Sequence, residues 1–468
     1  MTKELCYASA VDLARLIKAK QVSPVEVLEA HLQRIDSVNP TVNAIVTVVD
    51  QALEQAKISE TQLMKGDQCG PLFGVPFTIK DCVDTEGVRT TRGSKLFDNF
   101  VPVKDATVVN RLKRAGGIFM GKTNMPEFAL WAETDNSIFG RTVNPWNFER
   151  TPGGSSGGEA AALAAGLSPL GIGSDVGGSI RGPANFCGVV GLKATHGRVP
   201  LTGHWPETIL RAMHVGPMAR TVSDVALGMN IIAGHDGIDH YALSMPLPNF
   251  ANLDDIPAGL RIGWNASDCF KPIEPEVADI VAKAASSLEK AGCFVEEVKL
   301  PALENRDVQT LSLIAYVTEA SFYLDPIIHG REQELSSNML RRLDIPMPTL
   351  DQYIDALSQW EGLRQDIATY FRQYDALICP TNPLPAHTHS AIELVIAGET
   401  VSARDANRAT IPWNLTGSPA VSVPFGWSSD GLPIGVQIVG RHFDESTILK
   451  VATFLEEEGG TREMHPPL

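Results

Sequence analysis

Cysteine is scarce in this 468-residue chain, and its placement excludes two classes of protein. The seven cysteines are scattered, and no two of them form a C-x-x-C pair. A disulfide framework and a structural zinc site are therefore not expected, and a reducing compartment fits this usage. Histidine offers no metal motif either: H-E-x-x-H is absent, and the closest pair, His387 and His389, lies in a proline-rich stretch. We predict neither a metal nor a cofactor.

The chain also lacks a basic cluster and a long apolar run. Its formal net charge is −16, whereas a general binder of nucleic acid or of an anionic membrane needs a basic surface. No run of about 18 uncharged apolar residues is present, and the N-terminal residues contain no apolar signal region. We therefore expect a cytoplasmic protein that acts on a small molecule, without nucleic acid and without a membrane.

The composition that is present suits a globular α/β protein. Hydrophobic residues make up 44% of the chain, enough for a sizeable core. Apolar, β-prone runs alternate with amphipathic helical patterns, which predicts layers of helices on a sheet. No repeat or linker interrupts the pattern, so one large domain over residues 1–468 is favoured. Helices are predicted at 8–20, from Ser23, and at 105–115, 160–166, 221–233, 275–291, 350–373 and 446–458; strands at 71–79, 117–121, 189–192, 260–264, 294–298, 376–379, 419–424 and 433–439; and 380–408 is predicted as irregular surface.

Two serines stand in glycine-rich stretches, Ser155 in PGGSSGG and Ser179 in DVGGSIRG. Flanking glycines let the backbone turn tightly and leave space for a substrate. Such a hydroxyl becomes a nucleophile when a base is within reach, although a plain structural turn is the other interpretation. Ser156 formally fits the G-x-S-x-G elbow of α/β-hydrolases, but no strand leads into it, and no phosphate-loop continuation follows.

Lys80 closes the apolar strand predicted at 71–79. An ammonium group is costly to desolvate, so a lysine there is either ion-paired at the strand end or has a pKa lowered by burial, which would make its amine a base. Asp81 would face the opposite side of the strand. A neutral Lys80 amine acting through Ser155 on Ser179 would form a serine–serine–lysine relay, and the backbone N–H groups of DVGGS would stabilise an oxyanion.

With these residues in place, the sequence resembles the amidase signature family of serine hydrolases. The matching motifs run from Gly74-Val75-Pro76 to Lys80-Asp81 and continue as GKTNMPEFA, NPWN, TPGGSSGGEAAALAAG and GSDVGGSIRGPANFCGVVGLKATHGRVP. They define a signature core over residues 70–200, and Lys80, Ser155 and Ser179 are spaced 75 and 24 residues apart. The resemblance implies a mixed central sheet between layers of helices and an amidase that cleaves a carboxamide through an acyl-enzyme.

The resemblance also implies a role for each site residue. Lys80 would be the base, Ser155 the bridging serine after a cis peptide bond, and Ser179 the acylated nucleophile. The oxyanion would be bound by the N–H groups of Val176, Gly177, Gly178 and Ser179, and Ser174, Asp175 and Arg181 would hold the loop. The substrate pocket would be lined by Met125, Phe128, Leu130, Trp131 and Trp205, with Met213, Tyr316, Phe322 and Trp413 as further candidates, and this apolar lining favours an aryl or medium aliphatic group.

Two alternatives stay open beside a stand-alone amidase. The catalytic A subunit of the glutamine-dependent amidotransferase that acts on misacylated tRNA carries the same signature, and in it an aspartate holds the glutamine amino group. Here the corresponding position, seven residues before Asn414, is Asn407, a departure that favours the stand-alone amidase. The second alternative, a non-catalytic scaffold, has no physical need for a buried lysine aimed at two serines. A homodimer is possible, because homodimers are frequent in similar enzymes.

Overall fold

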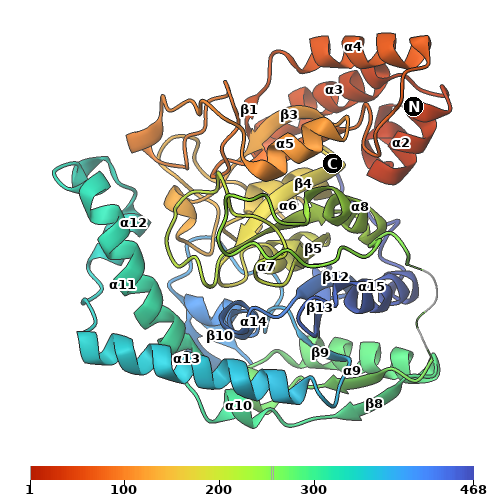
Figure 1. Ribbon diagram of the computed structural model, residues 1–468. Helices are drawn as coiled ribbons and strands as arrows, with labels where there is room; N and C mark the ends of the chain where they lie inside the picture. Colours follow the sequence, from red (N-terminus) through yellow and green to blue (C-terminus); the bar gives the residue numbers. More distant parts are fainter. Residues whose placement is uncertain (1, 254–255, 257) are drawn as a thin grey trace.

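One eleven-stranded mixed sheet runs through the molecule (Figure 1). The computed structural model describes residues 2–253, 256 and 258–468. The strand order is β1-β3-β2-β4-β6-β5-β12-β13-β9-β7-β8, and a separate hairpin pairs β10 with β11. The predicted fold class, a single α/β domain with a mixed central sheet, is confirmed. The strands are β1 Ile45–Val48, β2 Pro76–Lys80, β3 Ile118–Thr123, β4 Leu170–Asp175, β5 Val190–Lys193, β6 His214–Ala219, β7 Arg261–Trp264, β8 Phe294–Glu297, β9 Ala376–Pro380, β10 Glu393–Ile396, β11 Glu399–Ser402, β12 Ala420–Trp427 and β13 Pro433–Gly440.

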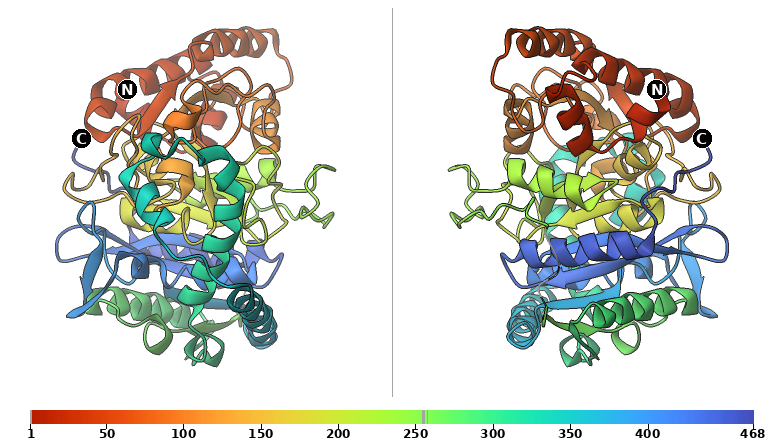
Figure 2. Two further views of the ribbon diagram at one scale, coloured as in Figure 1. Left: turned by 90° about the vertical axis from the view of Figure 1, so that its left-hand side faces the viewer. Right: turned by 90° about the vertical axis from the view of Figure 1, so that its right-hand side faces the viewer.

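Helices cover both faces of this sheet. One layer contains α8, α15 and α9, which lie one beside the next in the right-hand view of Figure 2. The opposite face is covered by α6 and α7, which pack on the central strands. The helices are α1 Thr2–Tyr7, α2 Ala10–Lys18, α3 Pro24–Val42, α4 Ala52–Lys65, α5 Thr107–Arg114, α6 Gly157–Ala164, α7 Arg181–Cys187, α8 Val222–Ile232, α9 Pro275–Lys290, α10 Pro301–Glu304, α11 Val308–Ile328, α12 Ser337–Leu343, α13 Leu350–Tyr370, α14 Ile411–Thr416 and α15 Glu445–Gly459.

Local sequence signals account for where several helices begin. Ser23 caps α3 by accepting from the Glu26 N–H, and the Glu26 carboxylate accepts from the Ser23 N–H in return. Thr349 and Gln352 form the same reciprocal pair at the start of α13. Each capping box satisfies N–H groups that the first helical turn leaves without partners. The helix predicted from the Ser23 capping box therefore begins where the sequence indicates, and the helix predicted at 350–373 begins at a capping box that the prediction did not include.

The region 310–412 departs most from the sequence-based prediction. It contains α11 and α12, which the sequence patterns do not delineate, and the β10–β11 hairpin lies inside the stretch predicted as irregular surface. By length and composition, α11 is long and apolar enough to cross a membrane, but it contains Glu319 and Asp325 and is therefore not an uncharged apolar run. It carries Glu319, whose carboxylate accepts from Tyr353 Oη on α13 at 2.9 Å, and it packs along α13.

The sheet changes direction at β4, and this change positions the site. β2 runs parallel to both β3 and β4, whereas β6 runs antiparallel to β4. All residues of β2 and β4 are buried, because helices cover both faces of the sheet there. The last residues of the two parallel strands, Lys80 and Asp175, therefore lie at the same edge of the sheet.

Candidate active site

Lys80 ends β2 with its side chain fully buried. Its Nζ lies 2.6 Å from Ser155 Oγ and 3.0 Å from Ser174 Oγ. Burial lowers the pKa of Lys80 to about 8, and the nearby Cys82, Asp175 and Glu159 offset only part of this effect. A considerable share of the amine is therefore neutral near physiological pH. A neutral amine has two N–H donors and one lone pair, so it can donate to Ser174 while it accepts the Ser155 proton.

Ser155 follows a cis peptide bond from Gly154, as the family resemblance implies. A Cβ at Gly154 would lie 2.6 Å from the carbonyl carbon of Ala132, so only glycine fits. The next N–H, of Ser156, donates to the carbonyl oxygen of Ser179 at 3.1 Å. This bond holds the two glycine-rich stretches side by side, with Ser155 buried and Ser179 partly exposed. The structure thus brings Lys80, Ser155 and the Ser179 segment together, while the Asp81 carboxylate turns away and accepts from Thr91 Oγ1 at 2.5 Å.

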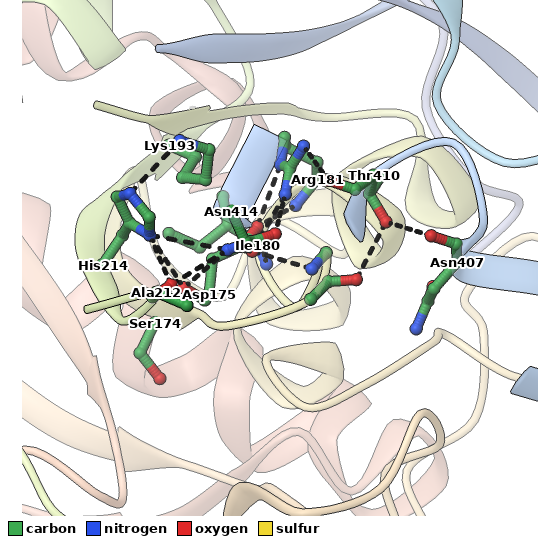
Figure 3. A network of polar contacts seen from close by, with 12 residues as sticks. Ser174, Asp175, Ile180, Arg181, Lys193, Ala212, His214, Asn407, Thr410 and Asn414 are labelled. Atoms are coloured by element: carbon green, nitrogen blue, oxygen red, sulfur yellow. Dashed lines mark hydrogen bonds and ion pairs between the residues drawn. The ribbon is translucent and has the colours of Figure 1, made fainter. Parts of the chain in front are cut away.

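Asp175 organises the loop that carries Ser179 (Figure 3). Its carboxylate accepts from the N–H groups of Gly178 at 2.7 Å and Ile180 at 3.0 Å. Arg181 Nε and Nη2 donate to the same carboxylate at 3.1 and 3.0 Å, and Asn414 Nδ2 donates at 2.8 Å. Burial alone would raise the pKa of Asp175, but the Arg181 charge and these hydrogen bonds hold it well below its usual range. The loop is therefore wrapped around a permanently charged carboxylate.

One of the four N–H groups expected to bind the oxyanion, that of Gly178, already has another acceptor. The Gly178 N–H donates to Asp175 Oδ1, so the expectation that it faces an oxyanion is wrong. The N–H groups of Val176, Gly177 and Ser179 have no acceptor within the part of the chain that the structure describes. Gly178 itself has φ +120°, and a Cβ there would lie 2.2 Å from Thr410 Oγ1. Its contribution is to let the loop turn closely past Thr410.

A narrow cavity of about 10 Å³ reaches Ser155 and Ser174. Of the five residues predicted to line the pocket, Phe128 and Leu130 do so, and Met213 and Tyr316 join them. Met125 does not line this cavity and is instead packed in the main core, with no solvent exposure. Trp205 packs behind the cavity against Phe128 at 5.1 Å between ring centroids, and Trp131 is partly exposed outside it. Of the further candidates, Phe322 is 72% exposed and Trp413 is fully buried.

Several residues of the site network were missed by sequence reasoning. Arg181 Nη1 donates to Gln437 Oε1 at 2.6 Å and to the Thr410 carbonyl at 3.0 Å. Lys193 and His214 complete the network behind Asp175. These residues come from strands and loops far apart in the chain, so no local spacing connects them. Two signals are usable: Lys193 lies in the GLKATHG part of the signature motif and closes a predicted apolar strand, and the NLTGSP stretch contains Asn414.

The site combines a buried amine in contact with a serine and a loop whose backbone N–H groups lack acceptors among the described residues. This arrangement is typical of a serine hydrolase that acts on carbonyl compounds. A model of the Amidase family matches residues 26–449. The chain belongs to the amidase family, and it is an enzyme of the class that acts on C–N amide bonds.

Three similar proteins indicate which members of the amidase family this chain resembles. The sequence is 38% identical to the A subunit of the Glutamyl-tRNA(Gln) amidotransferase of Moorella thermoacetica over 99% of both chains. The structure of the corresponding Glutamyl-tRNA(Gln) amidotransferase chain from Thermotoga maritima covers 99% of this chain and 97% of its own, with 31% identity and a TM-score of 0.79. A structure from a vestigial protein complex that reveals the origins of an s-triazine catabolic enzyme covers 97% of this chain and 99% of its own, with 31% identity and a TM-score of 0.91.

These similarities correct one expectation drawn from composition. We expected a protein that acts on a small molecule alone, without nucleic acid, because the net charge is −16. The curated relatives are instead subunits named for an amidotransferase of glutamyl-tRNA(Gln). Net charge describes a whole chain, and it does not describe the partners with which that chain forms a complex. The amidotransferase alternative therefore fits better than the stand-alone amidase.

Proposed function

We propose that this chain hydrolyses the side-chain amide of glutamine and does so as the catalytic subunit of an amidotransferase acting on glutamyl-tRNA(Gln). The observation that carries the proposal is the 2.6 Å contact between the buried Lys80 amine and Ser155, beside the Ser179 loop. It occurs in a chain that matches the amidotransferase relatives from end to end. The signature core at 70–200 would supply this chemistry, and the reaction would take place in the cytoplasm.

The chemistry begins with a serine that needs a base. Ser179 Oγ bonds to the carbonyl carbon of the amide, its proton passes to Ser155 Oγ, and the Ser155 proton passes to Lys80 Nζ. As the tetrahedral intermediate collapses, the C–N bond breaks and the proton returns through Ser155 to the leaving nitrogen, which departs as ammonia. Water then attacks the Ser179 ester with the same relay as base, and the acid is released.

The negative charge that develops on the carbonyl oxygen needs preorganised donors. The N–H groups of Val176, Gly177 and Ser179 suit this role, because they are not engaged by other acceptors in the described residues. Asp175 and Arg181 hold the loop in place, so these donors need no reorganisation during the reaction. Removing one such donor in other serine hydrolases costs about 10²–10³ in kcat.

Arg342 supports an amino acid amide as the substrate. Its side chain is buried, and its guanidinium lies 4.2 Å from the ring centroid of Tyr316, which lines the cavity. Nη2 donates to the Tyr316 carbonyl at 3.1 Å, but Nη1 is buried without a partner among the described residues. A buried guanidinium is costly without an acceptor. Arg342 does not itself line the cavity, so in this proposal the α-carboxylate of a bound amino acid reaches Nη1 past Tyr316. Asn407 Oδ1 keeps an acceptor for an ammonium group, although it lacks the charge of an aspartate.

A partner subunit would contribute the basic surface that this chain lacks. An acidic chain without a basic cluster has little electrostatic attraction for RNA. We therefore assign the contacts with tRNA mainly to a different subunit, and the release of ammonia to this one.

The test compares ammonia release from L-glutamine by the purified chain, alone and with the partner subunits and glutamyl-tRNA(Gln) of the same organism. The proposal expects turnover of glutamine that rises when the partners are present, and none with Ser179→Ala. Arg342→Met should raise KM for glutamine at least tenfold, since a lost charged hydrogen bond costs about 1.5–3 kcal/mol, yet leave KM for uncharged butyramide unchanged.

The second candidate, a stand-alone amidase for another amide, is favoured by the neutral Asn407 and by the TM-score of 0.91 to the triazine-related structure. A panel of anilides and aliphatic amides separates the two. Fast cleavage of such amides, with no cleavage of glutamine even with the partners present, would overturn the glutamine proposal. Asn407→Asp, which restores the carboxylate, should lower KM for glutamine only if glutamine occupies the site.

A further inference from the structure

Lys193, at the end of β5, is a second buried lysine near the loop (Figure 3). Its side chain has no solvent exposure, and no carboxylate of the described residues lies within ion-pair distance of its Nζ. Instead, Nζ contacts the carbonyl oxygen of Ser418, the carbonyl oxygen of Ala194 at 3.2 Å and His214 Nε2 at 3.3 Å. A buried lysine that contacts a histidine and two carbonyls has no role in the chemistry described so far.

The contacts of His214 fix where its hydrogen lies. Nδ1 is 2.8 Å from the Ala212 carbonyl oxygen and 3.3 Å from the Asp175 carbonyl oxygen. Both are acceptors, so Nδ1 carries the hydrogen and shares it between the nearer Ala212 carbonyl and the Asp175 carbonyl, and the 3.4 Å approach of Asn414 Nδ2 to Nδ1 is then a contact between two donors. Nε2 accepts from Lys193. All three neighbours of Lys193 are then acceptors. Burial lowers the pKa of Lys193 well below its usual value, yet only the ammonium form, with three N–H donors, satisfies all three acceptors, because a neutral amine would leave one of them facing its lone pair.

The chain of hydrogen bonds ends at a peptide unit of the loop. The Asp175 carbonyl oxygen accepts from His214 Nδ1 and from Asn414 Nδ2 at 3.1 Å. The N–H at the other end of the same peptide unit belongs to Val176, and it has no acceptor in the described part of the chain. Hydrogen bonds accepted by a peptide carbonyl strengthen its N–H as a donor, because the bonds polarise one another.

We propose that Lys193 and His214 are positioning residues that polarise the Asp175–Val176 peptide and so strengthen the Val176 N–H as an oxyanion donor. The inference rests on the proposed amide hydrolysis, in which that N–H faces the developing charge. Lys193 donates to His214 Nε2, His214 Nδ1 donates to the Asp175 carbonyl, and the Val176 N–H donates to the substrate oxygen. In this proposal Lys193, His214 and Asp175 do not touch the substrate, and only the Val176 N–H does.

The test replaces the amine without changing the volume much, in Lys193→Met. The oxyanion forms only in the transition state, so kcat should fall about tenfold, a fraction of the loss from deleting an oxyanion donor, while KM stays unchanged. Lys122→Met is the matched control. Lys122 is equally buried on β3, but its Nζ donates to the Val83 carbonyl, lies 4.0 Å from Asp81 Oδ1 and does not contact the loop. Its kcat, measured on folded protein, should stay within about twofold of the wild type.

A thioamide substrate distinguishes polarisation from a general structural effect. Sulfur is a weak acceptor, so a weaker N–H donor penalises the thioamide less than the amide. We would compare L-glutamine with its side-chain thioamide, or benzamide with thiobenzamide if that pair is cleaved. Lys193→Met should lower the ratio of amide to thioamide kcat about fivefold or more. If Lys193→Met does not fold, His214→Asn carries the same comparison, because its Nδ2 can replace the Nδ1 donor toward Asp175 while its shorter side chain has no atom at the Nε2 position that contacts Lys193.

The outcomes distinguish a failure of the polarisation proposal from a failure of the proposed amide hydrolysis. An equal loss for amide and thioamide, or an unchanged kcat, in a wild type that cleaves amides would overturn the polarisation proposal alone. A wild type that cleaves no amide would overturn the proposed function and this inference with it.

Discussion

Arg181 and Asp175 form a buried ion pair in which Nη2 and Nε lie 3.0 and 3.1 Å from the two carboxylate oxygens. Neither side chain has any solvent exposure. The remaining donor, Nη1, reaches Gln437 on β13 and the Thr410 carbonyl before α14. The pair therefore joins the loop of the signature core to the C-terminal third of the chain, which explains why matching residues extend well beyond residue 200.

Removing one partner of this pair should destabilise the whole fold. Arg181→Met would leave the Asp175 charge buried and only partly compensated, a change that typically costs about 3–5 kcal/mol. Urea unfolding followed by circular dichroism would measure the change in free energy. Arg150→Met is the control, because it pairs with Asp430 at the surface, where the Asp430 side chain is 69% exposed, and such a pair is expected to contribute at most about 1 kcal/mol. Equal losses in the two variants would contradict the central role of the Arg181 pair.

Gly178→Ala should impair catalysis more than stability. A Cβ there would lie 2.2 Å from Thr410 Oγ1 and 2.9 Å from Thr410 Cβ, so the loop must move. Misplacement by about 1 Å in an active site costs roughly 10²-fold in rate. Gly87→Ala provides the comparison, since Gly87 also has a positive φ of +71° but has nothing within 4 Å of its added Cβ. Steady-state kinetics showing similar kcat for both variants would argue against a constrained loop.

The rate should depend on the protonation of Lys80. Its pKa is lowered to about 8, so raising the pH from 6 toward 9 converts the ammonium into the amine that acts as base, and kcat/KM should rise to a plateau with a midpoint near 8. Lys80→Ala should lose about 10²–10⁴ in kcat. Ser174→Ala removes an acceptor that favours the charged form, so it should shift the midpoint to lower pH. A midpoint unmoved by that change would exclude Lys80 as the titrating group.

Glu159 should make the fold less stable as the pH rises through neutrality. Burial raises the pKa of this α6 carboxyl from 4.5 to about 7, and hydrogen bonds from Thr78 and Thr123 offset only part of the shift. Between those values the folded state holds a proton that the unfolded state has lost. Stability is therefore highest below about pH 4.5 for this group and falls by roughly 3 kcal/mol by pH 7.

Glu159→Gln stays uncharged and should flatten this dependence. The measurement is the free energy of unfolding in urea at pH 5, 6, 7 and 8. Some slope will remain in the variant, because burial also raises the pKa of Asp81 to about 6 and that of Glu456 to about 7. A wild-type protein that gains stability over the same range would contradict the assignment.

Much of the fold could be predicted because local signals and tertiary structure agree. The capping box at Ser23 and the alternation from β7 through α9 to β8 lie within one or two residues of their predicted bounds. The sequence does not predict β4, since LGIGSD carries two glycines and one β-branched residue, and its strand conformation comes from pairing with β2 and β6. The β10–β11 hairpin is hidden for a similar reason, next to a proline-rich stretch that suggests only irregular surface.

Some residues of the site could also be predicted from the sequence, and others could not. Lys80, Ser155 and Ser179 are flagged by unusual residues in unusual places, a lysine at the end of an apolar strand and serines among glycines. Lys193 closes the apolar strand predicted at 189–192, as Lys80 closes its own strand, but nothing local indicates its partners. Arg342 gives no such signal, because a lone cation in a sequence looks the same whether it is exposed or buried. Their surroundings are built from distant segments, and only the folded chain brings those segments together.

The reversal of strand direction at β4 has a consequence for how such an enzyme diversifies. The groups that would stabilise charge are main-chain amides left unpaired where β4 ends and the chain turns toward Ser179, so substitutions do not remove them. The side chains that line the cavity come from separate segments, among them η2 (Glu127–Ala129) and α11, which the sheet does not constrain. Substitutions in those segments can therefore change which acyl group the enzyme accepts, while the backbone N–H donors stay the same.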